Sequence, residues 1–149
     1  MVTFQVEPWA DALPEIKPLL HAHWQEMAAD KDQIKLDVDW QKYEALDAAG
    51  MLHCVTARDW DVIGYHWLMV VPHMHYASTL MAFSDVFWIK PEYRKGWCGV
   101  KLFRFTEDSL KAKGVRKVFL PTKPHLDLQA IYRRLGYRKH ETVYSKMIG

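Results

Sequence analysis

The sequence has little cysteine and no long apolar run. Its two cysteines, Cys54 and Cys98, form no disulfide or metal-binding pattern, so we expect two reduced thiols. No window approaches the roughly 18 apolar residues of a membrane helix. The first residues, 1–7, have no basic stretch leading into an apolar run. We therefore expect a protein without a secretory signal, located in the cytoplasm and not in a membrane.

Internal repeats, low-complexity tracts and linkers are also absent. The length of 149 residues fits one domain, and half of the residues are hydrophobic. A chain of this size can bury roughly 68–70% of its unfolded surface. The sequence therefore predicts one folded domain over residues 1–149.

Acidic and basic residues are separated along the chain. Residues 1–89 hold 5 Lys/Arg against 13 Asp/Glu, a charge of −8, while residues 90–149 hold 15 against 5, a charge of +10. Most of these side chains are expected to be solvated surface groups. The separation nevertheless suggests that the two halves face partners of opposite charge.

The first half of the chain alternates between strand and helix patterns. A strand is expected over Thr3–Glu7, a helix over 11–30, and a second helix from the N-cap Asp39 to Gly50. Strands then follow at Met51–Ala57, Val62–Val71 and Ser78–Ile89, the first two forming a hairpin.

The second half alternates between helix and strand. We expect a helix over 98–113, a strand over Val115–Leu120, a helix over Asp127–Leu135, and one or two strands within Tyr137–Ile148. An antiparallel meander followed by a β-α-β-α-β segment predicts the α/β class, with an α+β mixed sheet.

A glycine-containing turn joins the long strand to the helix after it. Free backbone N–H groups at a helix start attract anions, and glycines let a phosphate approach closely. Here the turn carries Gly96 and Gly99 together with Arg94, Lys95 and Lys101. It is either a phosphate-binding loop or an ordinary connection with basic side chains.

Two motifs resemble those of the GCN5-related N-acetyltransferase (GNAT) family. The turn is similar to its acyl-CoA motif Arg/Gln-x-x-Gly-x-Gly/Ala, with Arg94 first and Gly99 last, although Trp97 replaces the middle glycine. Residues 130–137, Ala-Ile-Tyr-Arg-Arg-Leu-Gly-Tyr, resemble the family's Leu-Tyr-x-x-Leu-Gly-Phe/Tyr motif. The family's Asn, seven residues before the motif Tyr132, is His125 here.

The resemblance implies acetyl-CoA as co-substrate and a set of contacts to it. Backbone N–H groups of Phe87, Trp88 and Ile89 would hold the acyl carbonyl and the pantetheine. His125 takes the place of a further CoA contact. The pyrophosphate would lie against the turn formed by Arg94, Lys95, Gly96, Trp97, Cys98, Gly99 and Val100.

Direct attack of an amine on the thioester is also implied. Tyr132 matches the family's tyrosine near the CoA sulfur and is expected to protonate the departing thiolate, unless it is only a core aromatic. Asp85, just before the splayed part of the strand, is the leading candidate for the base, directly or through water. It is otherwise an edge or cap carboxylate. Glu26 and His66 are weaker candidates for the base.

Other reactive residues receive structural interpretations. Cys98 as a nucleophile would need a histidine partner, and its thiol is expected to pack within the helix. The pairs His21/His23 and His73/His75 have no third ligand at a recognised spacing, so we expect no metal.

The acidic N-terminal half is expected to bind a cationic acceptor. Glu26 and Asp30, with Asp32 nearby, are the expected carboxylates, and Trp24 is the expected pocket wall, with Trp40, Trp60 and Trp67 as further candidates.

The most specific hypothesis is an N-acetyltransferase acting on a small-molecule amine, as a monomer or homodimer. A protein or peptide acetyltransferase and a non-catalytic acyl-CoA binding module remain alternatives. A nucleic-acid binder using Arg133, Arg134, Arg138 and Lys139 is a fourth and weaker hypothesis.

Overall fold

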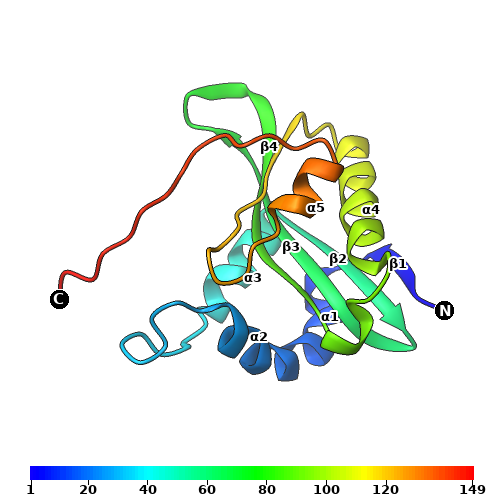
Figure 1. The fold of residues 1–149 in the computed structure, drawn as a ribbon. Coiled ribbons are helices and arrows are strands. Elements are labelled where there is room, and N and C mark those ends of the chain that lie inside the picture. Colours follow the sequence, from blue (N-terminus) through cyan, green and yellow to red (C-terminus); the bar gives the residue numbers. More distant parts are fainter.

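The computed structural model describes residues 1–149 and contains one five-stranded sheet (Figure 1). The strands follow the chain order: β1 (Thr3–Val6), β2 (Leu52–Asp59), β3 (Asp61–His73), β4 (Tyr76–Ile89) and β5 (Lys117–Phe119). The first four pair antiparallel, and β5 pairs parallel to β4. The predicted mixed sheet is confirmed.

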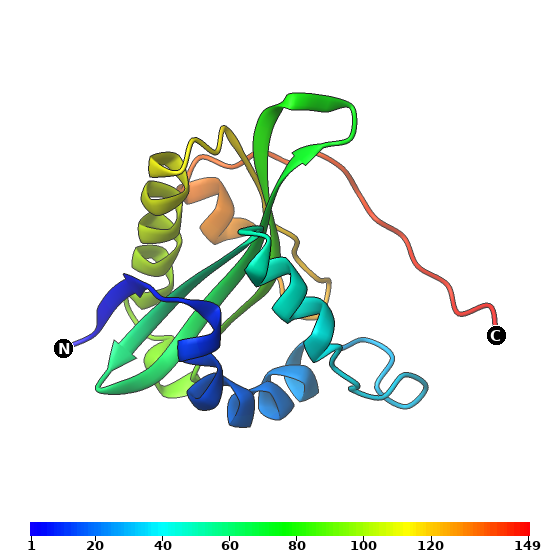
Figure 2. The ribbon, with the colours of Figure 1, turned by 180° about the vertical axis from the view of Figure 1, so that it is seen from behind.

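The helices cover both faces of the sheet. Helices α1 (Trp9–Ile16), α2 (Leu20–Met27) and α3 (Trp40–Ala48) lie on one face, and α4 (Cys98–Ala112) and α5 (Gln129–Arg134) on the other (Figures 1 and 2). Short 3₁₀ helices lie at Lys17–Leu19 and at Pro91–Tyr93. Helix α4 connects β4 to β5, as a parallel pair requires.

One long helix was predicted over 11–30, and this prediction is wrong in its continuity. The structure has two α-helices separated by the 3₁₀ segment Lys17–Leu19, which contains Pro18. Proline has no N–H to donate and its ring crowds the preceding turn, so the α-helical ladder is interrupted there. The break lets α2 turn toward the end of β4.

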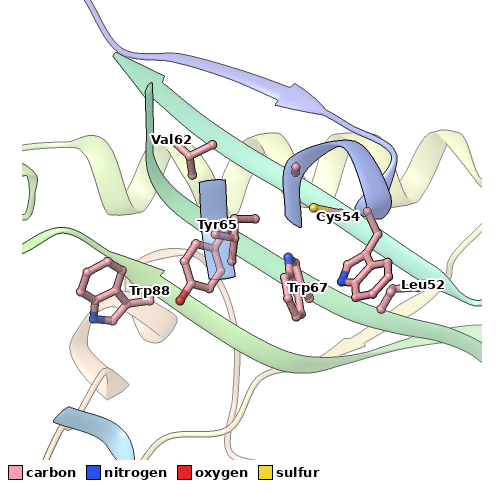
Figure 3. Close-up of a cluster of buried hydrophobic side chains, with 9 residues drawn as sticks. Leu52, Cys54, Val62, Tyr65, Trp67 and Trp88 are labelled. Carbon is pink, nitrogen blue, oxygen red and sulfur yellow. The ribbon is translucent and has the colours of Figure 1, made fainter. Parts of the chain in front are cut away.

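Aromatic side chains fill the layer between the sheet and α1–α3. Tyr65, Trp67 and Trp88 are at most 5% exposed and project from β3 and β4 toward this layer (Figure 3). Trp9 of α1 meets the edge of Trp67 at 5.9 Å between ring centroids, and Tyr43 of α3 stacks on Trp9 at 5.7 Å. These contacts fix α1 and α3 against the sheet.

Helix α4 packs its apolar stripe on the opposite face. Leu102, Phe103 and Leu110 are at most 2% exposed and contact strand residues such as Val55 and Leu68. Their spacing places them on one side of a 3.6-residue helix. Fully burying a side chain of this kind contributes roughly 1.5–3 kcal/mol, so this stripe is a main anchor of α4.

The strands predicted within Tyr137–Ile148 are absent, and that prediction is wrong. The segment has no regular secondary structure. Its first part lies beside β5, where the ring centroids of His140 and Phe119 are 5.1 Å apart, and its end runs away from the sheet (Figures 1 and 2). Val143, Tyr144 and Ile148 are 83%, 91% and 92% exposed. No strand pairs with this segment, so these side chains remain in solvent. The predicted β-α-β-α-β segment therefore ends at α5.

None of the helices combines the length and apolar character that crossing a bilayer requires.

Candidate functional site

Strand β4 loses its β5 partner halfway along its length. The β4–β5 ladder runs only from Met81↔Lys117 to Phe83↔Phe119, whereas β4 stays paired with β3 as far as Ile89. From Ser84 onward, one backbone edge of β4 is therefore open. Such an edge offers N–H and C=O groups to an extended ligand.

The direction of each N–H on this edge follows from strand alternation. The N–H of Lys90 donates to Ile63 of β3 at 2.8 Å. Because successive residues point to opposite sides, the N–H of Trp88 also faces β3, while those of Phe87 and Ile89 face the open edge. Of the three backbone donors expected from the sequence, two face the open edge.

A β-bulge sets Asp85 apart from its neighbours. Trp67 pairs with Val86 and Leu68 with Ser84, so Asp85 has no partner on β3. Its exposed carboxylate accepts a hydrogen bond from the Tyr43 hydroxyl of α3. Burial and the nearby Asp85 raise the pKa of Tyr43, so the phenol stays protonated as a donor. Asp85 therefore lies on the α1–α3 side of the sheet.

A cavity of about 770 Å³ opens where β4 and β5 separate. Residues of both strands, the 120–124 loop, α5 and the segment after it line this cavity. Five of its lining residues are basic and two are acidic: Lys117, Lys123, Arg133, Arg138, Lys139, and Asp127 and Glu141. The net positive lining favours an anionic ligand.

Tyr132 of α5 lines the same cavity. Its ring meets the edge of Phe103 at 5.7 Å, and Phe103 stacks on Phe87 at 4.1 Å. Its hydroxyl donates to the Pro121 carbonyl at 2.6 Å, and burial raises its pKa. Tyr132 is thus a protonated donor beside the open edge, on the face opposite Asp85.

The turn before α4 has the geometry of an anion-binding loop. Gly96 adopts φ of 82°, which favours glycine. The first hydrogen bond of α4 runs from the N–H of Lys101 to Trp97, so the N–H groups of Cys98, Gly99 and Val100 precede the ladder. A Cβ at Gly99 would meet only Ile89 Cδ1, at 3.7 Å. The backbone conformation therefore favours glycine at 96, whereas Gly99 leaves room for the close approach of a ligand.

A family comparison identifies this arrangement. The sequence profile described as the acetyltransferase (GNAT) family matches residues 13–137. The chain belongs to the GNAT acetyltransferase family.

Solved structures share the GNAT fold at low sequence identity. Ribosomal-protein-alanine N-acetyltransferase from Brucella melitensis biovar Abortus 2308 has a TM-score of 0.74 at 18% identity, covering 100% of this chain and 99% of its own. A predicted acetyltransferase from Clostridium acetobutylicum, solved with acetyl-CoA, has a TM-score of 0.72 at 11% identity, and the match covers 99% of this chain and 96% of that protein. An aminoglycoside acetyltransferase from an uncultured soil metagenomic sample has a TM-score of 0.75 at 13% identity, and the match covers 99% of this chain and 97% of that protein. Curated protein sequences gave no match.

Arg94, the first residue of the GNAT motif, is bonded to another predicted site residue. Its guanidinium forms an ion pair with Glu26 of α2, and its Nε donates to the Ile89 carbonyl at 2.8 Å. Trp88 Nε1 donates to the same Glu26 at 2.8 Å. The bond from Arg94 lowers the pKa of Glu26. The two residues, expected to bind opposite substrates, thus neutralise each other in this structure.

Trp97 and Cys98 surround the free end of α4. Trp97, in place of the motif's middle glycine, is 57% exposed, and the Arg134 guanidinium lies 5.5 Å from its ring centroid. Burial raises the pKa of the Cys98 thiol, which packs against the sheet. The thiol therefore stays protonated, as expected for a packing residue. Lys95 and Lys101 are exposed beside the loop.

His125 connects the loop before α5 to the end of α2. Its Nε2 bonds to the Met27 carbonyl at 3.1 Å, and Lys123 Nζ donates to the same oxygen at 2.9 Å. Donors of this kind satisfy the last carbonyls of a helix. His125 therefore joins the two sides of the site in this structure.

The expected acceptor residues are spread along the α1–α3 side. Asp30 accepts backbone bonds from Gln33 and Ile34 through its carbonyl, and its carboxylate has no bonded partner. Trp24 is half-buried beside His21. Trp67 is only 1% exposed and belongs to the core, whereas Trp60, 95% exposed, lies in the β2–β3 turn. These last two form no common pocket wall with Trp24.

Sequence reasoning missed Tyr43 and Ser84. Tyr43 matched only a helical pattern, and the residue it binds, Asp85, is 42 positions away. Ser84 interrupts the apolar run of β4 next to Asp85, which was the one available signal. No three His, Cys, Asp or Glu side chains are grouped as metal ligands.

Proposed function

We propose that this protein is an acetyl-CoA-dependent N-acetyltransferase that acetylates a cationic amine by direct attack. One observation carries the proposal: the open edge of β4 begins at Ser84, which lines a basic cavity, and leads through residues 90–97 to the free start of α4. CoA is an extended polyanion with amide groups, which suits each of these features. A relative with the same fold was solved with acetyl-CoA.

Each feature has a separate task in this proposal. The N–H groups at the start of α4 hold the pyrophosphate, helped by Lys95 and Lys101. The N–H groups of Phe87 and Ile89 bind the pantetheine and the thioester carbonyl, where negative charge develops during attack. The Tyr132 hydroxyl, whose proton is bonded to the Pro121 carbonyl in this structure, is proposed to turn that proton toward the leaving sulfur. Since a thiol has a pKa near 8.5, the raised pKa of Tyr132 favours this bond over complete proton transfer.

The amine is proposed to approach from the α1–α3 side. This side carries Asp85 and Asp30 and belongs to the acidic half of the chain. Asp85 accepts a bond from Tyr43 and keeps other lone pairs with which to accept the ammonium proton, directly or through water. A carboxylate here also attracts a cationic substrate.

Thiol release tests the activity. The protein would be incubated with acetyl-CoA and a panel of aminoglycosides, polyamines, lysine peptides and peptides with a free α-amine. Release above background with any member identifies the acceptor class and separates small-molecule from peptide acetylation. Acetyl-CoA binding without turnover on any amine would favour the binding-module alternative.

Calorimetry tests the CoA site independently. Gly99→Glu places a negative charge at the start of α4, and like charges in contact oppose binding by several kcal/mol, so we expect at least about 10-fold weaker CoA binding. Ala10→Glu adds the same charge at an exposed position in the first turn of α1 and is the matched control. Equal affinities of Gly99→Glu and wild type would contradict the assignment.

A further inference from the structure

A buried histidine lies directly behind the point where β4 and β5 separate. His66 of β3 is 0% exposed. The rings of Phe87 and Phe103 pack nearly perpendicular to its imidazole, with centroid distances of 5.1 and 5.6 Å. Both ring nitrogens have partners. Nδ1 lies 3.4 Å from the Thr106 hydroxyl of α4, and Nε2 lies 2.9 Å from the Ser84 hydroxyl of β4.

The proton positions follow from counting hydroxyl protons. Thr106 gives its single proton to the Leu102 carbonyl at 2.8 Å, so it can only accept from His66. Nδ1 therefore carries the imidazole proton. In the neutral ring Nε2 is then an acceptor, and the Ser84 hydroxyl must donate to it.

Ser84 lies on the wall of the cavity, and its hydroxyl oxygen has lone pairs available there. It is the first β4 residue beyond the last β4–β5 pair, and it lines the same cavity as Tyr132. Its proton is engaged by His66, so only lone pairs are left for a ligand. An oxygen in this state accepts hydrogen bonds and offers none.

We propose that Ser84 binds substrate in this site by accepting a hydrogen bond from a substrate N–H group, and that His66, held by Thr106, is the positioning residue that keeps the hydroxyl in its accepting state. This inference rests on the proposed function and adds a binding residue to it. Two sources supply such a donor: a pantetheine amide of acetyl-CoA and the acceptor amine.

The geometry gives His66 a role other than the base considered from the sequence. Burial holds its pKa at about 3, so the imidazole does not take up a proton at neutral pH. It also lies behind Ser84, away from the cavity. Its neutral form is what the accepting state of Ser84 requires.

Ser84→Ala tests the proposal by removing the acceptor. A neutral hydrogen bond contributes about 0.5–1.5 kcal/mol and one to a charged group about 1.5–3 kcal/mol. Weaker binding of acetyl-CoA in calorimetry, by about 2- to 12-fold, would identify a pantetheine amide. Unchanged CoA binding with an acceptor KM raised about 12- to 150-fold would identify the ammonium of the acceptor. Ser84→Thr keeps the hydroxyl and should restore binding to within about 2-fold.

Ser109→Ala is the matched control. Ser109 of α4 bonds to a second buried histidine, His53, at 2.8 Å in the same layer but does not line the cavity. It should lower stability about as much as Ser84→Ala while leaving CoA affinity and the acceptor KM unchanged. The inference alone, and not the proposed function, would be overturned by either of two results. The two variants could change CoA affinity and acceptor KM equally, or Ser84→Ala could keep the wild-type CoA affinity and acceptor KM. Failure of the wild type to bind acetyl-CoA would overturn the proposed function and this inference with it.

Discussion

Three buried histidines should make the protein unusually sensitive to mild acid. His23, His53 and His66 are 7%, 2% and 0% exposed. Burial lowers the pKa of His23 and His53 to about 4 and that of His66 to about 3. In the unfolded chain each titrates near 6.5. Their contribution to stability is therefore complete above pH 6.5 and is lost as the pH falls from 6.5 toward 4.

The size of the effect follows from proton linkage. Each proton taken up on unfolding changes the free energy of unfolding by about 1.4 kcal/mol per pH unit. Between pH 7 and pH 5 this amounts to about 2 kcal/mol for each histidine, or about 6 kcal/mol for all three. Glu107 acts in the opposite sense because burial raises its pKa. A loss of this size is comparable to the total stability of a typical domain, about 5–15 kcal/mol.

Urea unfolding followed by far-UV circular dichroism at several pH values measures this slope. His53→Gln should reduce the slope of the unfolding free energy against pH between pH 7 and 5. The reduction corresponds to about one proton fewer taken up on unfolding, since linkage assigns one proton to each such histidine. His75→Gln, at an exposed position in the β3–β4 hairpin, should leave it unchanged. Carboxylates with lowered pKa values, such as Glu7 at about 2, act at lower pH. A free energy of unfolding that is constant from pH 7 to 5 would refute the reasoning.

Three further predictions concern catalysis, packing and electrostatics. Tyr132→Phe removes a hydrogen-bond donor to the developing thiolate and should lower kcat by about 10²- to 10³-fold while CoA affinity in calorimetry stays constant; unchanged kcat would leave Tyr132 a packing residue. Gly64→Val should lower the thermal midpoint, because a Cβ there would lie 3.0 Å from Ile89 Cγ1 and 3.1 Å from the Trp88 carbonyl, and overpacking costs about 1–3 kcal/mol. With a cationic acceptor, KM should rise with salt, and Asp30→Asn should raise it further at low salt without affecting CoA binding; productive acceptors that are all neutral or anionic would contradict this.

Elements set by local signals were predictable from the sequence. Asp39 accepts from the N–H of Lys42 at 2.9 Å and begins α3 as expected. Gly114, with φ of 89°, ends α4 as expected. The glycine turn between β4 and α4 was also found in the expected place. In each case the residues that decide the structure lie within a few positions of one another.

Features set by distant residues were not predictable in the same way. The ion pair between Arg94 and Glu26 joins residues 68 positions apart, and His66 meets Ser84 and Thr106 from two other elements. Sequence spacing carries no information on such encounters, because packing of α2 and α4 against the sheet brings them about. The segment after α5 contains apolar residues but lacks a partner strand, and apolar content alone does not create one.

The distribution of tryptophan gives the protein two separate optical signals. Trp9, Trp67 and Trp88 are buried together beneath α1–α3, where an apolar environment shifts indole emission to shorter wavelengths. Trp97 is exposed in the loop before α4, under the Arg134 guanidinium. Light emitted at long wavelengths therefore includes a contribution from the loop at which the pyrophosphate is proposed to bind, and light at short wavelengths reports on the opposite layer. With the exposed Trp60 and the half-buried Trp24 and Trp40 replaced by phenylalanine, ligand occupancy and core integrity could be followed in one cuvette.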